Sequence, residues 1–189
     1  LVSVNTACVS DTVLFTASGG DLYEFFRNEI SVSGGVTTRT NTISFSNLSN
    51  LESVRVEVTD TAGCTALSDK VTMTMLTIPS ASLSSGVALD IVCSGEYPIF
   101  TAGPAVAGYT YQFFVNNSPQ TTGVTTNTFD SSAVSKTIVL GATNIISVRV
   151  SNSVSGVSCT DTASLTLFVN SLTGANSISA SQTVCAGGT

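Results

Sequence analysis

The chain has 189 residues, of which 42% are hydrophobic and only 10% are charged, and its formal net charge is −6. This hydrophobic fraction is sufficient to form protein cores and excludes a wholly disordered chain. The six Lys and Arg residues are scattered singly, so we expect no surface that would bind nucleic acid or an anionic membrane. No apolar run approaches the roughly 18 residues of a membrane span, and no secretory leader is recognisable, as expected of an internal or processed segment.

Short stretches rich in β-branched and aromatic residues alternate with Gly, Asn and Ser, and none shows a helical period. We therefore predict an all-β fold. In the first half the expected strands are residues 12–17, 22–27, 30–33, 42–47, 53–60 and 70–77. In the second half they are residues 98–102, 109–116, 126–130, 136–140, 144–151 and 163–170. The stretch 80–92 is suitable for a further strand that begins the second half.

Several predicted strands have one apolar face. Val54, Val56 and Val58 alternate with polar residues, and the range 71–75 repeats this pattern. Because alternate side chains of a strand point to opposite faces, these strands are expected to bury one face only. Short strands at intervals of about 8 to 12 residues, separated by turn residues, are typical of a sandwich. We predict antiparallel β-sandwich domains.

The sequence contains an internal repeat that starts at a cysteine, namely Cys8, Cys93 and Cys185. The matching segments are Phe15-Thr16-Ala17 with Phe100-Thr101-Ala102, Tyr23-x-Phe25-Phe26 with Tyr111-x-Phe113-Phe114, and Val54-Arg55-Val56 with Val148-Arg149-Val150. The spacing suits one small β domain per repeat. A boundary is expected at Ile78-Pro79, because proline cannot donate to a β ladder. The predicted units are residues 1–78, which lack most of their first strand, a complete unit, 79–170, and the beginning of a third, 171–189.

Five cysteines in a chain without histidine indicate an oxidising compartment. The two cysteines of each repeat are separated by about one domain length, and the close Cys-x-x-Cys pairs typical of metal sites are absent. We therefore predict one disulfide in each domain, Cys8–Cys64 and Cys93–Cys159. The alternative is that the cysteines are buried free thiols. Cys185 is unpaired within this window, and its partner is expected beyond Thr189.

The order of these features resembles the immunoglobulin-like or PKD-like tandem repeats of large bacterial surface adhesins. The shared features are the cysteine, the apolar-Thr-Ala segment, Tyr-x-Phe, Val-x-Val, Gly63-Cys64-Thr65 and a closing strand before a proline. Such repeats occur in gliding-motility adhesins and other cargo of the type IX secretion system. The resemblance covers essentially the whole chain and implies tandem immunoglobulin-like sandwiches on the bacterial cell surface. The tryptophan of many immunoglobulin domains is absent, and Phe25 or Phe113 stands in its place.

The resemblance also implies a modification. Three segments are similar to the Asp-Thr-apolar motif of O-glycosylation in the same bacterial group, and their candidate acceptors are Thr12, Thr61 and Thr162. The alternative is that an Asp before Thr accepts hydrogen bonds from the local backbone at a turn.

The residue types needed for catalysis are largely missing. Without histidine the chain contains no Ser-His-Asp or Cys-His arrangement and no imidazole metal ligand. Isolated carboxylates and the lack of tryptophan argue against a glycosidase, and no calcium-binding loop motif occurs. We predict no enzyme activity, no cofactor and no metal site.

The leading hypothesis is a non-catalytic stalk or spacer of a secreted adhesin. It would contact neighbouring repeats of the same chain, while glycans or surface components bind other parts of the parent protein. One alternative is a carbohydrate- or host-ligand-binding module that uses loops around Gly34-Gly35, Gly103-Pro104 and residues 116–122. Another is a filament subunit whose incomplete first domain takes a strand from a neighbour.

Overall fold

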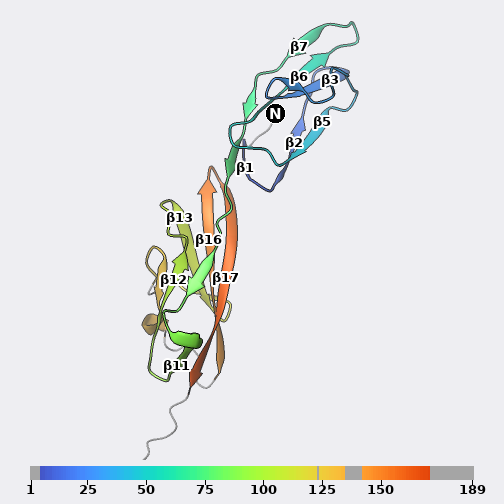
Figure 1. Cartoon of the computed structure of the whole chain (residues 1–189). Helices are drawn as coiled ribbons and strands as arrows, with labels where there is room; N and C mark the ends of the chain where they lie inside the picture. The colour runs from blue at the N-terminus through green and yellow to red at the C-terminus, as the bar shows by residue number, and fades with distance from the viewer. Residues whose placement is uncertain (1–4, 123, 135–141, 171–189) are drawn as a thin grey trace, which may run out of the picture.

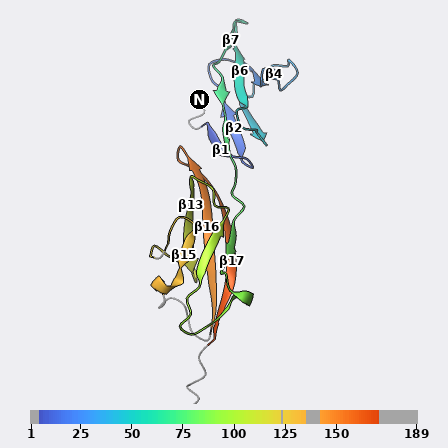
Figure 2. The same cartoon turned by 60° about the vertical axis from the view of Figure 1, so that its left-hand side comes forward.

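The computed structural model describes residues 5–122, 124–134 and 142–170. These residues form two β-sandwiches joined end to end (Figure 1). A view turned by 60° shows the same elongated arrangement (Figure 2). Residues 77–81 connect the sandwiches without entering a strand. The predicted all-β fold of tandem immunoglobulin-like sandwiches is confirmed.

The first domain consists of two facing layers. Its strands are β1 (Thr6–Cys8), β2 (Thr12–Thr16), β3 (Leu22–Arg27), β4 (Ile30–Ser31), β5 (Thr42–Ser46), β6 (Ser53–Thr59), β7 (Thr65–Leu67), β8 (Val71–Thr72) and β9 (Thr74–Leu76). One sheet has the order β4-β3-β6-β7, and β8 also pairs with β6. The antiparallel pair β2-β5 forms the other layer, and β1 runs parallel to β9, the last strand of the domain.

The second domain repeats this plan with longer strands. Its elements are β10 (Ser82–Ser84), the 3-10 turn η1 (Ala88–Asp90), β11 (Ile91–Cys93), β12 (Ile99–Gly103), β13 (Tyr109–Val115), β14 (Ser118–Pro119), β15 (Thr128–Asp130), the 3-10 turn η2 (Ser131–Val134), β16 (Thr143–Val154) and β17 (Val157–Asn170). The sheets have the orders β10-β12-β15 and β11-β17-β16-β13-β14. Again the short strand β11 runs parallel to the last strand, β17.

Each sandwich has its own hydrophobic core. In the second domain the rings of Phe100, Phe113 and Phe129 are fully buried, and Phe129 lies between the other two at centroid distances of 5.9 and 5.6 Å. In the first domain Phe15 packs edge to face against Phe45 at 5.8 Å. The alternation of Val, Ile and Phe with polar residues places these side chains inward, as in any strand with one solvated face.

The predicted strands are present wherever the described residues cover them, and the segment 136–140 lies outside those residues. The expected inward face is also correct, since Val54, Met73 and Met75 are buried in the first core. The sequence interpretation missed β1, β7, β11 and β14, because two or three residues are too few to show an alternation. The third unit predicted at 171–189 lies outside the described residues as well.

Candidate functional site

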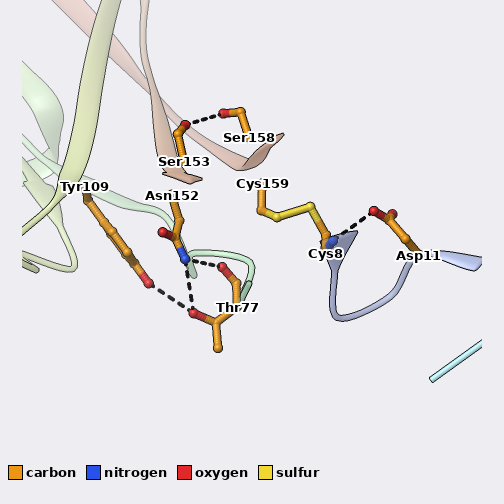
Figure 3. Close-up of a disulfide and its surroundings, with 8 residues drawn as sticks. All are labelled: Cys8, Asp11, Thr77, Tyr109, Asn152, Ser153, Ser158 and Cys159. Carbon is orange, nitrogen blue, oxygen red and sulfur yellow. Dashed lines mark hydrogen bonds between the residues drawn. A yellow bond between two sulfur atoms is a disulfide. The ribbon is translucent and has the colours of Figure 1, made fainter. Parts of the chain in front are cut away.

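A disulfide between Cys8 and Cys159 links the two domains (Figure 3). The two Cα atoms are 5.7 Å apart, an ordinary separation for a disulfide. Cys159 is buried at this junction, with 1% of its surface exposed. The predicted pairs Cys8–Cys64 and Cys93–Cys159 are therefore wrong. The expectation of one disulfide inside each domain is replaced by one disulfide that joins the domains.

The path of the chain explains the error. Cys8 ends β1 beside Leu76, the last residue of β9, where the chain leaves the first domain. Cys64 lies in the β6–β7 hairpin at the far end of the same sandwich (Figure 1). A disulfide requires Cα atoms within about 7 Å, so it cannot span the length of a sandwich. The sequence carries no signal for this, because the parallel pairing of β1 with β9, which places Cys8 at the end opposite the β6–β7 hairpin, is visible only in the structure.

Hydrogen bonds beside the disulfide hold the start of the connecting segment. The side-chain amide of Asn152 in β16 donates to the backbone oxygen of Thr77 at 3.0 Å and lies 3.4 Å from its hydroxyl. The Thr77 hydroxyl is also 3.4 Å from the hydroxyl of Tyr109 in β13 (Figure 3). The first residue of the connection is thus bound to the second domain from two strands.

The end of the connecting segment is held as well. The backbone N–H of Ala81 donates to Oδ2 of Asp161 in β17 at 2.8 Å. This bond, together with the backbone N–H of Thr162, holds the pKa of the Asp161 carboxyl below its ordinary value. Both ends of the connecting segment are therefore bound to the second domain. The two sandwiches are joined covalently in two places, by this segment and by the disulfide.

Cys64 and Cys93 are free thiols, and both are exposed. Cys64 lies in the hairpin at the outer end of the first domain, and Cys93 ends β11 at the outer end of the second (Figure 1). Among the described residues, one free cysteine therefore lies at each outer end of the pair of domains. Cys185 lies outside the described residues.

The first domain contains a cavity of about 750 Å³ that is open to solvent. It lies between β2, β6 and the segment 64–71, and Phe15, Ala17 and Val58 contribute to its lining. In the second domain the corresponding space is filled by β10, whose Leu83 faces Ala102 of β12. Ala102 and Ala17 occupy the same position of the repeat. Among the described residues, the first domain has no strand at the position that β10 takes beside β12, and the cavity lies at that position.

The loops considered for ligand binding do not meet at one surface. Gly34 and Gly35 belong to the β4–β5 loop of the first domain. Gly103-Pro104 precedes β13 and the range 116–122 follows it, so the length of that strand separates these two loops. Three predicted loops thus lie on three different parts of the molecule.

The three candidate O-glycosylation sites, Thr12, Thr61 and Thr162, are exposed. The aspartate before each threonine accepts a hydrogen bond from a backbone N–H, as the structural alternative expects. Glycosylation at these positions stays a prediction.

Charged side chains form surface ion pairs rather than a reactive cluster. Glu52 pairs with Arg27 at 2.6 Å, and Glu29 pairs with Arg55 and Lys70. The Arg27 guanidinium lowers the pKa of Glu52, and Lys70, followed by Arg55, lowers that of Glu29. Among the residues that the structure describes, no group of three or more His, Cys, Asp or Glu is placed to hold a metal ion. Within the same residues, no helix has the length and apolar character needed to cross a membrane.

Comparison with solved structures gives immunoglobulin- and fibronectin-like modules. The chain is similar to the fibronectin(III)-like modules of Clostridium thermocellum CbhA, with a TM-score of 0.49 and 12% identity over 88% of this chain and 90% of that chain. It is also similar to murine CEACAM1b, with a TM-score of 0.42 and 11% identity over 87% and 96% of the two chains. No protein-family model matches the sequence. No curated protein matches it either.

Proposed function

We propose that the chain is a non-catalytic segment of a long secreted surface protein of bacteria, where it acts as a stalk or spacer of an adhesin. In this proposal residues 1–78, 79–170 and 171–189 belong to three successive repeats, and neighbouring repeats are the main partners. The protein would be cargo of the type IX secretion system, as in gliding-motility adhesins. The single observation that supports the proposal is the disulfide between Cys8 and Cys159, which joins two sandwiches end to end.

The position of this disulfide suits a segment that bears load. A force applied at the two ends of the described chain passes from Thr6 through Cys8 to Cys159, and then along β17 to Asn170. Residues 9–158 lie outside this covalent path. Unfolding of either sandwich within that loop therefore adds no length to the loaded chain while the disulfide is intact. A spacer that must keep its length under tension benefits from this arrangement.

Single-molecule stretching of the full chain, held at its two termini, tests this function. Cys8 and Cys159 are separated by 151 residues, and a fully extended loop of that length spans roughly 500 Å. We expect that most of this length is released only after a reductant is added. The variant Cys8→Ser should release it without reductant, and Cys64→Ser should behave as the unchanged chain. Equal extension of the oxidised and reduced chains would show that the disulfide does not carry the load.

The surface location has its own test. Antibodies against this segment should label intact cells, and protease treatment of intact cells should remove the label. A signal that requires cell permeabilisation would contradict a surface stalk.

A second candidate function is a filament subunit that exchanges strands, and the cavity of the first domain favours it. Among the described residues, β2 pairs with β5 along one edge, and the cavity lies beside its other edge. Strand exchange adds a strand of one molecule to the edge of a sheet in another. In the second domain the same edge is covered by β10, through the pairing of Leu83 with Ala102.

A peptide of residues 79–87, which contains β10, tests strand exchange in trans. If the edge accepts a strand, the peptide should slow amide hydrogen exchange in β2 of the full chain, and a peptide with Leu83→Ser should do so less. The chain alone should also form assemblies that grow with concentration and persist in reductant. Unchanged exchange in β2 together with a monomer at all concentrations would remove this candidate.

A further inference from the structure

The surroundings of Cys93 reproduce those of Cys8. Cys8 ends β1 and is paired in parallel with Leu76, and Cys93 ends β11 and is paired in parallel with Asn170. The residue after each cysteine continues the ladder, since its backbone N–H donates to the oxygen of the same partner at 3.0 and 2.9 Å. Both cysteines thus stand where the last strand of a domain ends and the chain leaves it.

The turn that follows each cysteine is closed by the same hydrogen bonds. The backbone N–H of Cys8 donates to the Asp11 carboxylate at 2.9 Å, and that of Cys93 donates to the Glu96 carboxylate at 2.8 Å. In return the N–H of Asp11 or Glu96 donates to the cysteine oxygen at 2.9 or 3.0 Å. A carboxylate three residues after the cysteine therefore closes both turns with the same pair of hydrogen bonds, although Gly95 has a φ of +92° and its equivalent Ser10 has no positive φ.

Cys64 and Cys159 are equivalent in the same sense. Tyr23 faces Val58 in the first domain, and Tyr111 faces Val150 in the second. The residue two positions after each valine, Asp60 or Asn152, pairs with a cysteine on the other side of the hairpin. Asp60 donates its backbone N–H to the oxygen of Cys64 at 3.0 Å. Asn152 is the register partner of Cys159.

We propose that Cys64 and Cys93 are disulfide-forming sites for adjacent repeats, with the same pairing as Cys8–Cys159. Cys93 would bond the hairpin cysteine of the repeat that follows, and Cys64 would bond the first-strand cysteine of the repeat that precedes. Within one molecule the two thiols cannot bond each other, because they lie at opposite ends of it (Figure 1). The inference rests on the tandem organisation in the proposed function, and it does not depend on an adhesive role.

The difference in exposure between equivalent cysteines supports this assignment. Cys159, which is bonded across the junction, has 1% of its surface exposed, whereas its equivalent Cys64 is exposed. Cys8 is half-buried, whereas its equivalent Cys93 is exposed. Cys8 and Cys159 lie between the two domains and are covered there. Cys64 and Cys93 lie at the outer ends and are accessible to a further domain.

Formation of each bond is an oxidation of two thiols. The two cysteines lose two protons and two electrons to an external disulfide, either of a small thiol or of a protein thiol oxidase, and that disulfide leaves as two thiols. An extracytoplasmic compartment supplies this class of oxidant. The product is an array in which every junction between repeats is bridged.

A full chain with an internal duplication tests the proposal directly. A second copy of residues 77–170, carrying Cys93→Ser, is inserted after Asn170, so the original Cys93 is followed by a complete repeat with its own hairpin cysteine. After folding with oxidised glutathione, we expect the Cys93 peptide to be linked to a Cys159 peptide in molecules that also contain the Cys8–Cys159 link. Alkylation of Cys93 should fall at least tenfold relative to the unduplicated chain.

Two control variants of the duplicated chain identify the partner of Cys93. With Cys159→Ser in the inserted repeat, alkylation of Cys93 should return to its original level. With Cys159→Ser in the original repeat only, the Cys93 link should persist. The proposal is wrong if Cys93 remains open to alkylation while Cys8–Cys159 forms, or if its link is lost with the original Cys159.

A second measurement does not depend on folding of the inserted repeat. The full chain with Cys185→Ser is concentrated and oxidised, and linked peptides are identified by mass spectrometry. We expect Cys64 of one copy to be linked to Cys93 of another in clear excess over the like pairs, since only the unlike pair repeats the observed junction. Equal yields of like and unlike pairs contradict the proposal. The stretching experiment tests the Cys8–Cys159 bond and uses Cys64→Ser only as a control, so its failure and the failure of this proposal can be told apart.

Discussion

The two domains share one repeat pattern but differ in how their cores are closed. In the second domain Phe100, Phe113 and Phe129 have no exposed surface, and β10 covers the edge of β12. In the first domain Phe15 and Phe25 retain 4% and 7% exposure beside a cavity of about 750 Å³. The comparison teaches that the closed core is the one whose edge is covered by the three-residue strand β10, and that the open core has no described strand at that position.

The domains also differ in their use of charge. The ion pairs of the described residues, which join Arg27 to Glu52 and both Arg55 and Lys70 to Glu29, all lie in the first domain. Arginines lie over aromatic rings in both domains, Arg27 and Arg55 in the first at 5.6 and 5.7 Å and Arg149 in the second at 5.6 Å, so the difference is in the ion pairs alone. We therefore expect the second domain to depend mainly on packing, and the first domain to be less sensitive to packing and more sensitive to pH.

The largest effect is expected from truncating equivalent core rings. Phe100→Ala should destabilise the second domain by about 3 to 5 kcal/mol, because its ring is enclosed on all sides. Phe15→Ala should cost the first domain roughly 2 kcal/mol, because that ring already borders the cavity. Denaturant unfolding measures both losses of stability, and hydrogen exchange shows which domain unfolds. Phe168→Ala, at a ring with 38% exposure, is the control and should cost less than about 1 kcal/mol. Equal losses at Phe15 and Phe100 would contradict the difference between the cores.

The next largest effect is expected from opening the junction. The double variant Cys8→Ser with Cys159→Ser removes the disulfide and should lower stability by about 2 to 4 kcal/mol in thermal unfolding. Small-angle scattering should at the same time show a wider range of end-to-end distances, because the bonds of Thr77 and Ala81 then hold the junction alone. Cys64→Ser is the matched control. If the control and the double variant unfold at the same temperature, the disulfide does not stabilise the pair of domains.

A smaller effect is expected when the second domain is made to resemble the first. Leu83→Ala shortens the side chain with which β10 covers the second core and should cost about 1 to 2 kcal/mol, because Leu83 is only half-buried. Its exposed neighbour in β10, Ser84, serves as the control through Ser84→Ala. Hydrogen exchange in β12 should rise in the first variant and stay unchanged in the second. An unchanged rate in both would show that β10 does not close this core.

The strands could be predicted from sequence because their signal is local. The alternation of Val54, Val56 and Val58 in β6 follows from the geometry of one strand and needs no knowledge of its neighbours. The disulfide could not be predicted in this way, because the spacing of Cys8 and Cys64 says how much chain separates them and nothing about the end of the sandwich at which each lies. Cys159 bonds to Cys8 only because two domains are stacked, and that relation depends on Thr77 and Asn152 at the junction.

The smallest effect is expected from acid, and it should appear in the first domain. The pKa of Glu52 lies below its ordinary value of 4.5, because Arg27 stabilises the charged form. A lowered pKa in the folded state means that this stabilisation is complete above about pH 4.5 and is lost as the pH falls through the folded value. Because Arg27 and Glu52 are partly exposed, the loss should be less than about 1 kcal/mol. Denaturant unfolding at pH 6 and pH 3 measures it, and Arg27→Gln should make the first domain less dependent on pH. A variant that keeps the full acid dependence would assign the effect to another carboxylate with a lowered pKa, and Glu29 in the first domain and Asp161 in the second are then the groups to test.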